Sequence, residues 1–268
     1  MTNPCRRALV AAVALLLGAS LTNAIGAESQ PATVLITGSS RGIGLEFARQ
    51  YAEQGWRVIA TARNLETAQP LKELAAKHSN IRLETLDVTN GEQIAALAAR
   101  LKDRPIDVLI NNVGDTGEFK GQFLGKLDHE RFGYYMETNA HSAIRMAEAF
   151  LPHVQASGQK KMIAISSLAG SFGAKGGGQP GGYWYKASKA AMNMLMLTLS
   201  QDVKAKGVIV ASLSPGLVDT HNYAARGIRL PNTTAVDVSV GGMIKVIEGL
   251  TIEQTGQFIR YGGEVQPW

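Results

Sequence analysis

Short apolar runs alternate with longer amphipathic segments along most of the chain. The run TVLIT at 33–37 is rich in β-branched residues, and apolar positions recur at helical spacing over 45–54. Further predicted strands lie at 57–61, 81–86, 107–110, 161–166, 207–214 and 257–261, and further predicted helices at 65–77, 92–102, 128–156, 183–206 and 235–250. Strands that alternate with helices of this length indicate βαβ units. We therefore expect one α/β domain over residues 30–268, a doubly wound parallel β-sheet flanked by helices.

The first 27 residues follow a different pattern. Two arginines precede an apolar stretch at 8–17, and small residues then offer cleavage points after Ala24 or Ala27. We interpret residues 1–27 as a signal peptide and expect an exported, periplasmic protein that uses the twin-arginine or the general secretory route. An uncleaved membrane anchor is the weaker alternative, because a membrane-spanning helix needs about 20 apolar residues. No stable membrane span is expected after cleavage.

Composition and charge exclude several classes of function. The formal net charge of +5 is scattered over 268 residues without a long basic run, so we expect no nucleic-acid partner. Cys5, the only cysteine, lies in the predicted signal peptide, so the mature domain has no thiol nucleophile and no disulfide. The five histidines show no ligand spacing, and we predict no metal site.

A glycine-rich segment, GSSRGIG at 38–44, joins the first predicted strand to the first predicted helix. Glycines allow the backbone to turn sharply and to approach a ligand without a Cβ clash. The start of the helix then offers unpaired N–H groups to a pyrophosphate. The segment predicts a dinucleotide site, although its spacing differs from the commoner GxGxxG pattern.

Charge at the end of the second predicted strand bears on the choice of cofactor. A carboxylate there binds the ribose 2′-OH of NAD, whereas an arginine accommodates the 2′-phosphate of NADP. Here the strand ends at Arg63 without an acidic residue, and Arg41 in the glycine turn can contact the same phosphate. We predict NADP(H), with NAD(H) as the alternative. The alternative for Arg63 is a solvent-exposed residue at a helix start.

Tyr185 and Lys189 lie four residues apart in a predicted helix and therefore share one face. A neighbouring ammonium favours a phenolate, so we expect Lys189 to lower the pKa of Tyr185 from its ordinary value of about 10. The phenol could then act as a general acid or base. Because such a pair is common on helix surfaces, this interpretation depends on the neighbouring motifs.

Those motifs resemble the short-chain dehydrogenase/reductase family. They follow the family order: TGxxxGxG at 37–44, Asp87-Val88, NNVG at 111–114, Asn139, Ser166-Ser167, YKASK at 185–189, and SPG at 214–216 with Thr220 beyond it. The segments GGYWYKASKAAMNM and TGQFIRYGGEVQPW are most similar to the C-factor and sniffer-like carbonyl reductases. The resemblance implies a Rossmann-type fold and an oxidoreductase that interconverts a carbonyl and an alcohol.

The resemblance also implies roles for individual residues. The implied catalytic residues are Asn139, Ser167, Tyr185 and Lys189, with Ser166 as the alternative to Ser167. Lys189 would also hold the nicotinamide ribose, and Asn139 would fix a water that relays protons. The implied cofactor contacts are Gly38, Ser40, Arg41, Gly42, Ile43, Gly44, Arg63, Asp87, Val88, Asn112, Tyr185, Lys189, Pro215, Gly216 and Thr220. Ser167, Tyr183 and Trp184 are the implied substrate contacts, and aromatic packing at a helix start is the alternative for the last two.

Substrate specificity in this fold lies in loops, here about 173–182 and 217–234. Ser167 and Tyr185 are 18 positions apart, longer than is expected for the family, and the excess lies in the glycine-rich loop 173–182. We expect a small carbonyl or alcohol substrate and a homodimer or homotetramer formed through the helices at 128–156 and 183–206. The alternative function is a nucleotide-binding signalling protein of the C-factor type with little turnover. The presence of all four catalytic residues favours the enzyme.

Overall fold

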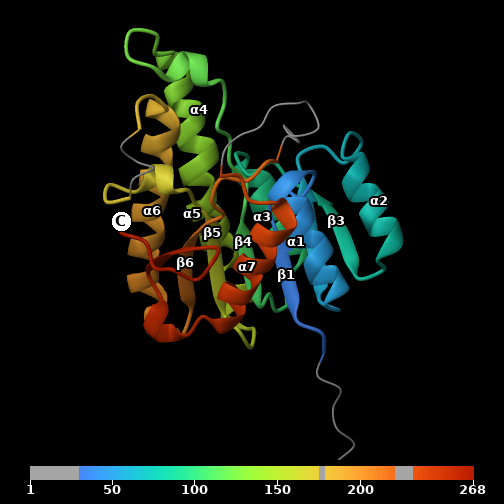
Figure 1. Cartoon of the computed structure of the whole chain (residues 1–268). Helices are drawn as coiled ribbons and strands as arrows, with labels where there is room; N and C mark the ends of the chain where they lie inside the picture. The colour runs from blue at the N-terminus through green and yellow to red at the C-terminus, as the bar shows by residue number, and fades with distance from the viewer. Residues whose placement is uncertain (1–29, 175–178, 221–231) are drawn as a thin grey trace, which may run out of the picture. The chain divides into compact units, whose positions relative to one another are not determined.

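The strands form a single seven-stranded parallel sheet in the order β3-β2-β1-β4-β5-β6-β7 (Figure 1). They are β1 (Thr33–Ile36), β2 (Arg57–Ala62), β3 (Ile81–Thr85), β4 (Val108–Asn111), β5 (Lys161–Ile165), β6 (Ile209–Ser214) and β7 (Gln257–Arg260). The strand order reverses between β1 and β4, and in open α/β sheets ligands bind at the carboxyl edge beside such a point. The predicted doubly wound sheet is confirmed.

Helices cover both faces of this sheet. One face carries α1 (Gly42–Glu53), α2 (Gln69–Lys77) and α7 (Val236–Gly249), and the other carries α3 (Gly91–Arg100), α5 (Ser142–Gln155) and α6 (Tyr183–Lys204). Alternate residues of each strand enter the two cores, so Val34 and Ile36 face α1 whereas Leu35 faces the opposite helices. Both faces are apolar, which explains why the strands read as continuous hydrophobic runs.

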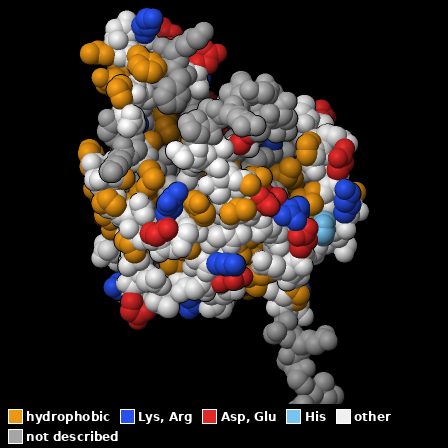
Figure 2. All heavy atoms as spheres, viewed as in Figure 1, with side chains coloured by type: hydrophobic (Ala, Val, Ile, Leu, Met, Phe, Trp, Pro, Cys, Tyr) orange, Lys and Arg blue, Asp and Glu red, His pale blue; other side chains and the backbone are white. Residues whose placement is uncertain are grey.

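The computed structural model describes residues 30–174, 179–220 and 232–268, and Ala32–Trp268 forms one compact unit. The predicted signal peptide, 1–27, and parts of the loops 173–182 and 217–234 lie outside the described residues. Within the described ranges no helix has the length and hydropathy to cross a membrane. Hydrophobic side chains are exposed around α4 (Phe132–Met136), where Leu124 is 79% exposed (Figure 2).

The helix predicted over 128–156 contains a widened turn. A 3-10 turn (His129–Arg131) and α4 lead into a π-helical turn, η4 (Glu137–His141), before α5 begins. The side chain of Asn139 in this turn binds the loop after β4: its Nδ2 donates to the carbonyl of Asp115 at 2.9 Å, and its Oδ1 accepts from the Asp115 N–H at 2.7 Å. Hydrophobic periodicity cannot reveal such a widened turn, because the segments on either side keep their helical spacing.

The packing of α1 against the sheet generates a stability prediction. Phe47 is completely buried in the core beneath α1 and α7, and its truncation to alanine leaves a cavity. We expect Phe47→Ala to lower the free energy of unfolding by about 3–5 kcal/mol, measured by urea denaturation. Val238→Ala is the control, because Val238 in α7 is 57% exposed and its truncation should change stability by no more than about 0.5 kcal/mol. Equal effects of the two substitutions would contradict this packing.

Candidate active site

The glycine turn between β1 and α1 brings the backbone to the sheet edge. Gly38 has a φ of 69°, and a Cβ on Gly44 would lie 2.2 Å from the Gly38 carbonyl oxygen, so neither position suits a larger residue. The Nδ2 of Asn112 donates to the carbonyls of Thr37 and Gly38 at 2.9 and 3.1 Å, which ties the end of β4 to the turn. No side chain caps α1 at Arg41, so its first N–H groups face the edge.

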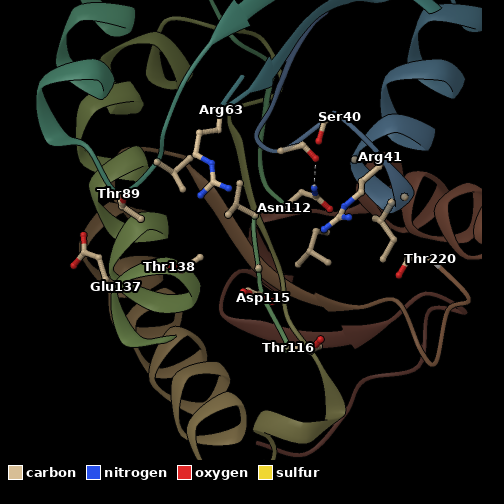
Figure 3. Close-up of a pocket in the computed structure, with 18 of the residues that line it drawn as sticks. Ser40, Arg41, Arg63, Thr89, Asn112, Asp115, Thr116, Glu137, Thr138 and Thr220 are labelled. Carbon is tan, nitrogen blue, oxygen red and sulfur yellow. Dashed lines mark hydrogen bonds between the residues drawn. The ribbon is translucent and has the colours of Figure 1, made fainter. Parts of the chain in front are cut away.

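A cleft of about 680 Å³ extends along this edge from the glycine turn to α6 (Figure 3). Most of the predicted cofactor contacts line it: Gly38, Ser40, Arg41, Gly42, Ile43, Gly44, Arg63, Asp87, Val88, Asn112, Tyr185, Lys189, Pro215 and Thr220. Gly216, the remaining one, follows Pro215 with a φ of 77° and is not among the lining residues. The structure thus gathers into one cleft residues that are up to about 180 positions apart in the sequence.

The donors in the cleft fit an anionic dinucleotide. The guanidinium groups of Arg41 and Arg63 both extend into the cleft (Figure 3), and the uncapped start of α1 can bind a pyrophosphate. The position at the end of β2 holds Arg63 and no carboxylate, as the sequence indicated. Among the described residues no cluster of histidine, cysteine, aspartate or glutamate side chains could hold a metal ion.

Tyr185 lies in the first turn of α6, and the Ser167 side chain is close enough to its phenol to influence the phenol's pKa. Ser166 is occupied elsewhere, because its hydroxyl donates to Oδ1 of the buried Asn193 at 2.6 Å. The geometry therefore favours Ser167 over Ser166 as the hydroxyl beside the phenol. Burial raises the pKa of Tyr185 above its ordinary value, and the nearby Ser167 side chain opposes that shift in part.

Lys189 follows one turn later on the same helix and is only 3% exposed. Its Nζ donates to the Ile165 carbonyl at the end of β5 at 2.8 Å, and burial lowers its pKa to about 8. The net shift of the Tyr185 pKa is upward and not the expected lowering, because burial is the largest influence on the phenol. Burial is the dominant influence on both groups, and it disfavours the charged form of each.

Asn139 is completely buried and approaches Lys189 from the π-helical turn. A Cβ on Gly114 would lie 3.0 Å from Nζ of Lys189 and 3.6 Å from Oδ1 of Asn139, so all three residues meet beside the end of β4. The Asn139 amide also donates to the Ser188 hydroxyl at 2.9 Å. The four predicted catalytic residues are therefore brought together from β5, α6 and the π-helical turn.

Gln122 was not identified from the sequence. Its side chain is 1% exposed, and its Oε1 accepts a hydrogen bond from the Tyr185 N–H at 3.0 Å. Its Nε2 donates to the Thr116 carbonyl at 2.8 Å and to the Tyr135 hydroxyl at 3.2 Å. The amide thus connects the loop after β4 and α4 to the helix that carries the phenol, and no local sequence signal marks such a loop residue.

Further residues line the cleft beyond the predicted cofactor contacts, and of these only Ser166 and the motif residues Val113 and Gly114 were named from the sequence. Tyr134 and Asp115 both line the cleft, and the Tyr134 hydroxyl donates to Oδ2 of Asp115 at 2.8 Å. The remaining ones are Leu86, Thr89, Val113, Gly114, Thr116, Gly133, Glu137, Thr138, Ile165 and Ser166. Several of these are sequence neighbours of predicted site residues at the ends of strands, such as Leu86 and Thr89 on either side of Asp87-Val88.

The predicted substrate contacts Tyr183 and Trp184 receive no support from this geometry. Neither residue lines the cleft, and Nε1 of Trp184 donates to the Asp128 carbonyl at 2.8 Å. The Trp184 ring packs edge-on against Phe132, with ring centroids 5.2 Å apart. Successive helical residues point about 100° apart, so these side chains leave α6 in other directions than Tyr185. The observed role of Trp184 is the alternative considered above, aromatic packing at a helix start.

Comparison with known proteins identifies the family. The short chain dehydrogenase family model matches residues 32–228. The NADPH-bound carbonyl reductase from chicken fatty liver is 32% identical, with a TM-score of 0.79, and the match covers 89% of this chain and 99% of that one. The carbonyl reductase Sniffer of Drosophila melanogaster is 29% identical, with a TM-score of 0.79 and coverage of 89% and 100%.

A signalling protein is also among the relatives. The C-signal of Myxococcus xanthus is 35% identical over 173 residues, which cover 65% of this chain and 99% of that protein. The resemblance found in the sequence motifs is confirmed by these matches and by the seven-stranded sheet. The chain belongs to the short-chain dehydrogenase/reductase family and is an oxidoreductase.

Proposed function

We propose that the protein is an NADP(H)-dependent oxidoreductase that interconverts a carbonyl and an alcohol, with Tyr185 as the general acid for reduction and the general base for oxidation. One observation carries the proposal: Tyr185, with Ser167 beside it, shares a cleft with buried Lys189, the glycine turn and two arginines. The related chicken carbonyl reductase, which binds NADPH, supports the same conclusion.

The proton-transfer chemistry follows from the side chains. A bound nicotinamide cofactor would supply or accept the hydride. The Ser167 hydroxyl would donate a hydrogen bond to the substrate oxygen, and the Tyr185 hydroxyl would give its proton to that oxygen. Because burial raises the pKa of Tyr185, the phenol is protonated at neutral pH, as reduction requires. The Lys189 ammonium, one turn away on the same face of α6, would stabilise the phenolate that remains.

The preference for NADP(H) over NAD(H) rests on charge at the adenosine end of the cleft. Arg41 and Arg63 both line this region, and a guanidinium binds a phosphate through paired hydrogen bonds. No acidic residue stands at the end of β2 to accept the ribose hydroxyls of NAD. A 2′-phosphate would therefore gain contacts here that a hydroxyl would not.

A second candidate is a nucleotide-binding signalling role, which the similarity to the C-signal favours. Such a role needs the cofactor cleft but does not need Tyr185 or Lys189 to act on a substrate. Cofactor binding alone cannot separate the two candidates, since both require it. Turnover of a carbonyl separates them.

Export and self-association are further proposals. Export rests on the arginines and apolar run within residues 1–27, and N-terminal sequencing of the protein recovered from the periplasm would test it.

Self-association through α6 is supported by exposed apolar side chains on that helix, Tyr183 and Met194, which are 43% and 62% exposed. Light scattering of the purified protein would test that proposal.

Tyr185→Phe tests the proposed acid, because it removes one hydroxyl and keeps the ring. We expect kcat for NADPH-dependent reduction, measured over a panel of aldehydes, ketones and quinones, to fall by about 100-fold or more. NADPH affinity, measured by fluorescence titration, should stay within about threefold, since the substitution leaves the phosphate-binding end of the cleft intact. Unchanged turnover would exclude Tyr185 as the acid. Tight NADPH binding by the wild-type protein with no turnover would favour the signalling role.

The low pKa of Lys189 predicts a pH dependence. Below a pH of about 8 the ammonium is charged and can stabilise the developing phenolate, and above it the charge is lost. We expect kcat/KM for NADPH in carbonyl reduction to decrease as the pH rises through about 8. In Lys189→Arg the side chain remains charged, so the decrease should move to higher pH. The same midpoint in both proteins would assign the titration to another group.

Arg63→Ser tests the choice of cofactor. Loss of a charged hydrogen bond to the 2′-phosphate costs about 1.5–3 kcal/mol, so kcat/KM for NADPH should fall by about 10- to 100-fold while that for NADH changes little. Arg104→Ser is the matched control, because Arg104 is exposed and lies outside the cleft. An equal decrease with NADPH and NADH would argue against phosphate recognition by Arg63.

A further inference from the structure

Among the described residues, one guanidinium at the carboxyl edge of the sheet has no acidic partner. Arg260 is the last residue of β7, and within the described ranges its side chain forms no hydrogen bond or ion pair. Its Nε is buried and has no hydrogen-bond acceptor among the described residues. The guanidinium carbon lies 5.0 Å from the centroid of the Tyr261 ring, a cation–π contact. Buried charged donors normally have acceptors, so this arrangement leaves hydrogen-bonding capacity for a ligand.

Strand register places Arg260 near the catalytic residues. Arg260 is paired with Ser214 of β6, and Leu213 of β6 is paired with Ile165 of β5. Adjacent strands are about 4.8 Å apart, so the end of β7 lies about 10 Å from the end of β5. Ser167 follows directly after that end of β5.

The guanidinium lies beside the turn that follows β6. Ile259 packs into the core beneath α1 and α7, so the side chain of its neighbour Arg260 leaves β7 on the opposite face, and its guanidinium reaches the ring of Tyr261. Nη2 of Arg260 is 3.9 Å from the position of a Cβ on Gly216. Gly216 directly follows Pro215, which lines the cleft, and the guanidinium therefore lies beside the turn that borders the reacting end of the cleft.

The segment after Ser167 borders the same face of β7. The Ser171 hydroxyl donates to the Pro267 carbonyl at 2.6 Å, and the Gly173 N–H donates to the Trp268 carbonyl at 3.0 Å. The Trp268 ring stacks on Phe258, which faces the same side as Arg260. Arg260 is thus beside the Gly216 turn, and the Ser171 segment is tied to residues that pack on Phe258, two positions before Arg260 in β7.

We infer that Arg260 is a specificity-determining residue that binds a carboxylate of the substrate, at the end remote from the reacting carbonyl. This inference rests on the proposed carbonyl reduction. The planar guanidinium offers paired donors that match a carboxylate, and it keeps its charge at every relevant pH. The substrate class is therefore an oxo acid, or the corresponding hydroxy acid, whose carbonyl and carboxylate are separated by a spacer.

Matched substrate pairs test the inference by turnover. The purified protein would be assayed with NADPH on 4-carboxybenzaldehyde and its methyl ester, and on levulinate and its ethyl ester. Arg260→Gln should lower kcat/KM for the acids by about 10- to 100-fold and leave the esters within about threefold. Arg260→Lys should restore part of the preference, because it keeps the charge. Equal losses for acids and esters would assign Arg260 a structural role and overturn the inference.

A binding measurement separates this inference from the proposed reaction. Calorimetric titration of the NADP-loaded protein with benzoate and with benzamide measures anion recognition without turnover. We expect tighter binding of benzoate, lost in Arg260→Gln, and unchanged thermal unfolding of the variant. Equal affinities for the two ligands would overturn carboxylate recognition even if neutral aldehydes are reduced. Absence of turnover on every carbonyl, with benzoate binding intact, would instead contradict the proposed reaction.

Discussion

The contact between the first turn of α1 and the end of β1 constrains the whole catalytic edge. A side chain at Gly44 would collide with the Gly38 carbonyl, so only a bare backbone allows the helix to start this close to the sheet. Asn112 then bonds to the same turn and aligns β4 with β1. The uncapped N–H groups, Arg41 and the end of β4 consequently converge on a single cleft.

The catalytic centre depends on polar groups held away from water. Lys189 is almost completely buried and donates a hydrogen bond to the Ile165 carbonyl. Asn139 donates a hydrogen bond to the backbone carbonyl of Asp115. Burial favours the neutral form of both ionisable partners, which keeps the Tyr185 phenol protonated and brings the Lys189 pKa close to the physiological range. When Lys189 is protonated, the low polarity of the site strengthens the electrostatic interaction between its ammonium and a reacting group.

Most of the fold could be predicted from the sequence, but less of the chemistry of the site. Runs such as 33–36 and 209–214 are apolar on both faces, and that pattern is sufficient to identify buried parallel strands. The start of α2 at Gln69 rather than residue 65 was missed, because Asn64 accepts a hydrogen bond from Glu66 and forms a local turn. The Tyr185 pKa could not be predicted from helical spacing, since burial depends on segments distant in sequence.

Tertiary contacts also explain the residues that no motif indicated. Gln122 is important because of what it bonds to, and three of its four partners lie on other elements or loops. Arg260 looks like an ordinary strand end until the register shows which face it occupies. Such roles arise from packing, whereas the glycine turn and the Tyr-x-x-x-Lys pair carry their geometry within a few consecutive residues.

The attachment of Ser171 and Gly173 to Pro267 and Trp268 has a consequence for the order of folding. A ribosome releases the nucleotide-binding strands, the glycine turn and the catalytic helix long before it reaches residue 267. The segment that follows Ser167 therefore cannot acquire its final anchorage during most of translation. The nascent chain can assemble its cofactor half early, but the substrate side matures only after synthesis of the last strand and the residues that fold back on it.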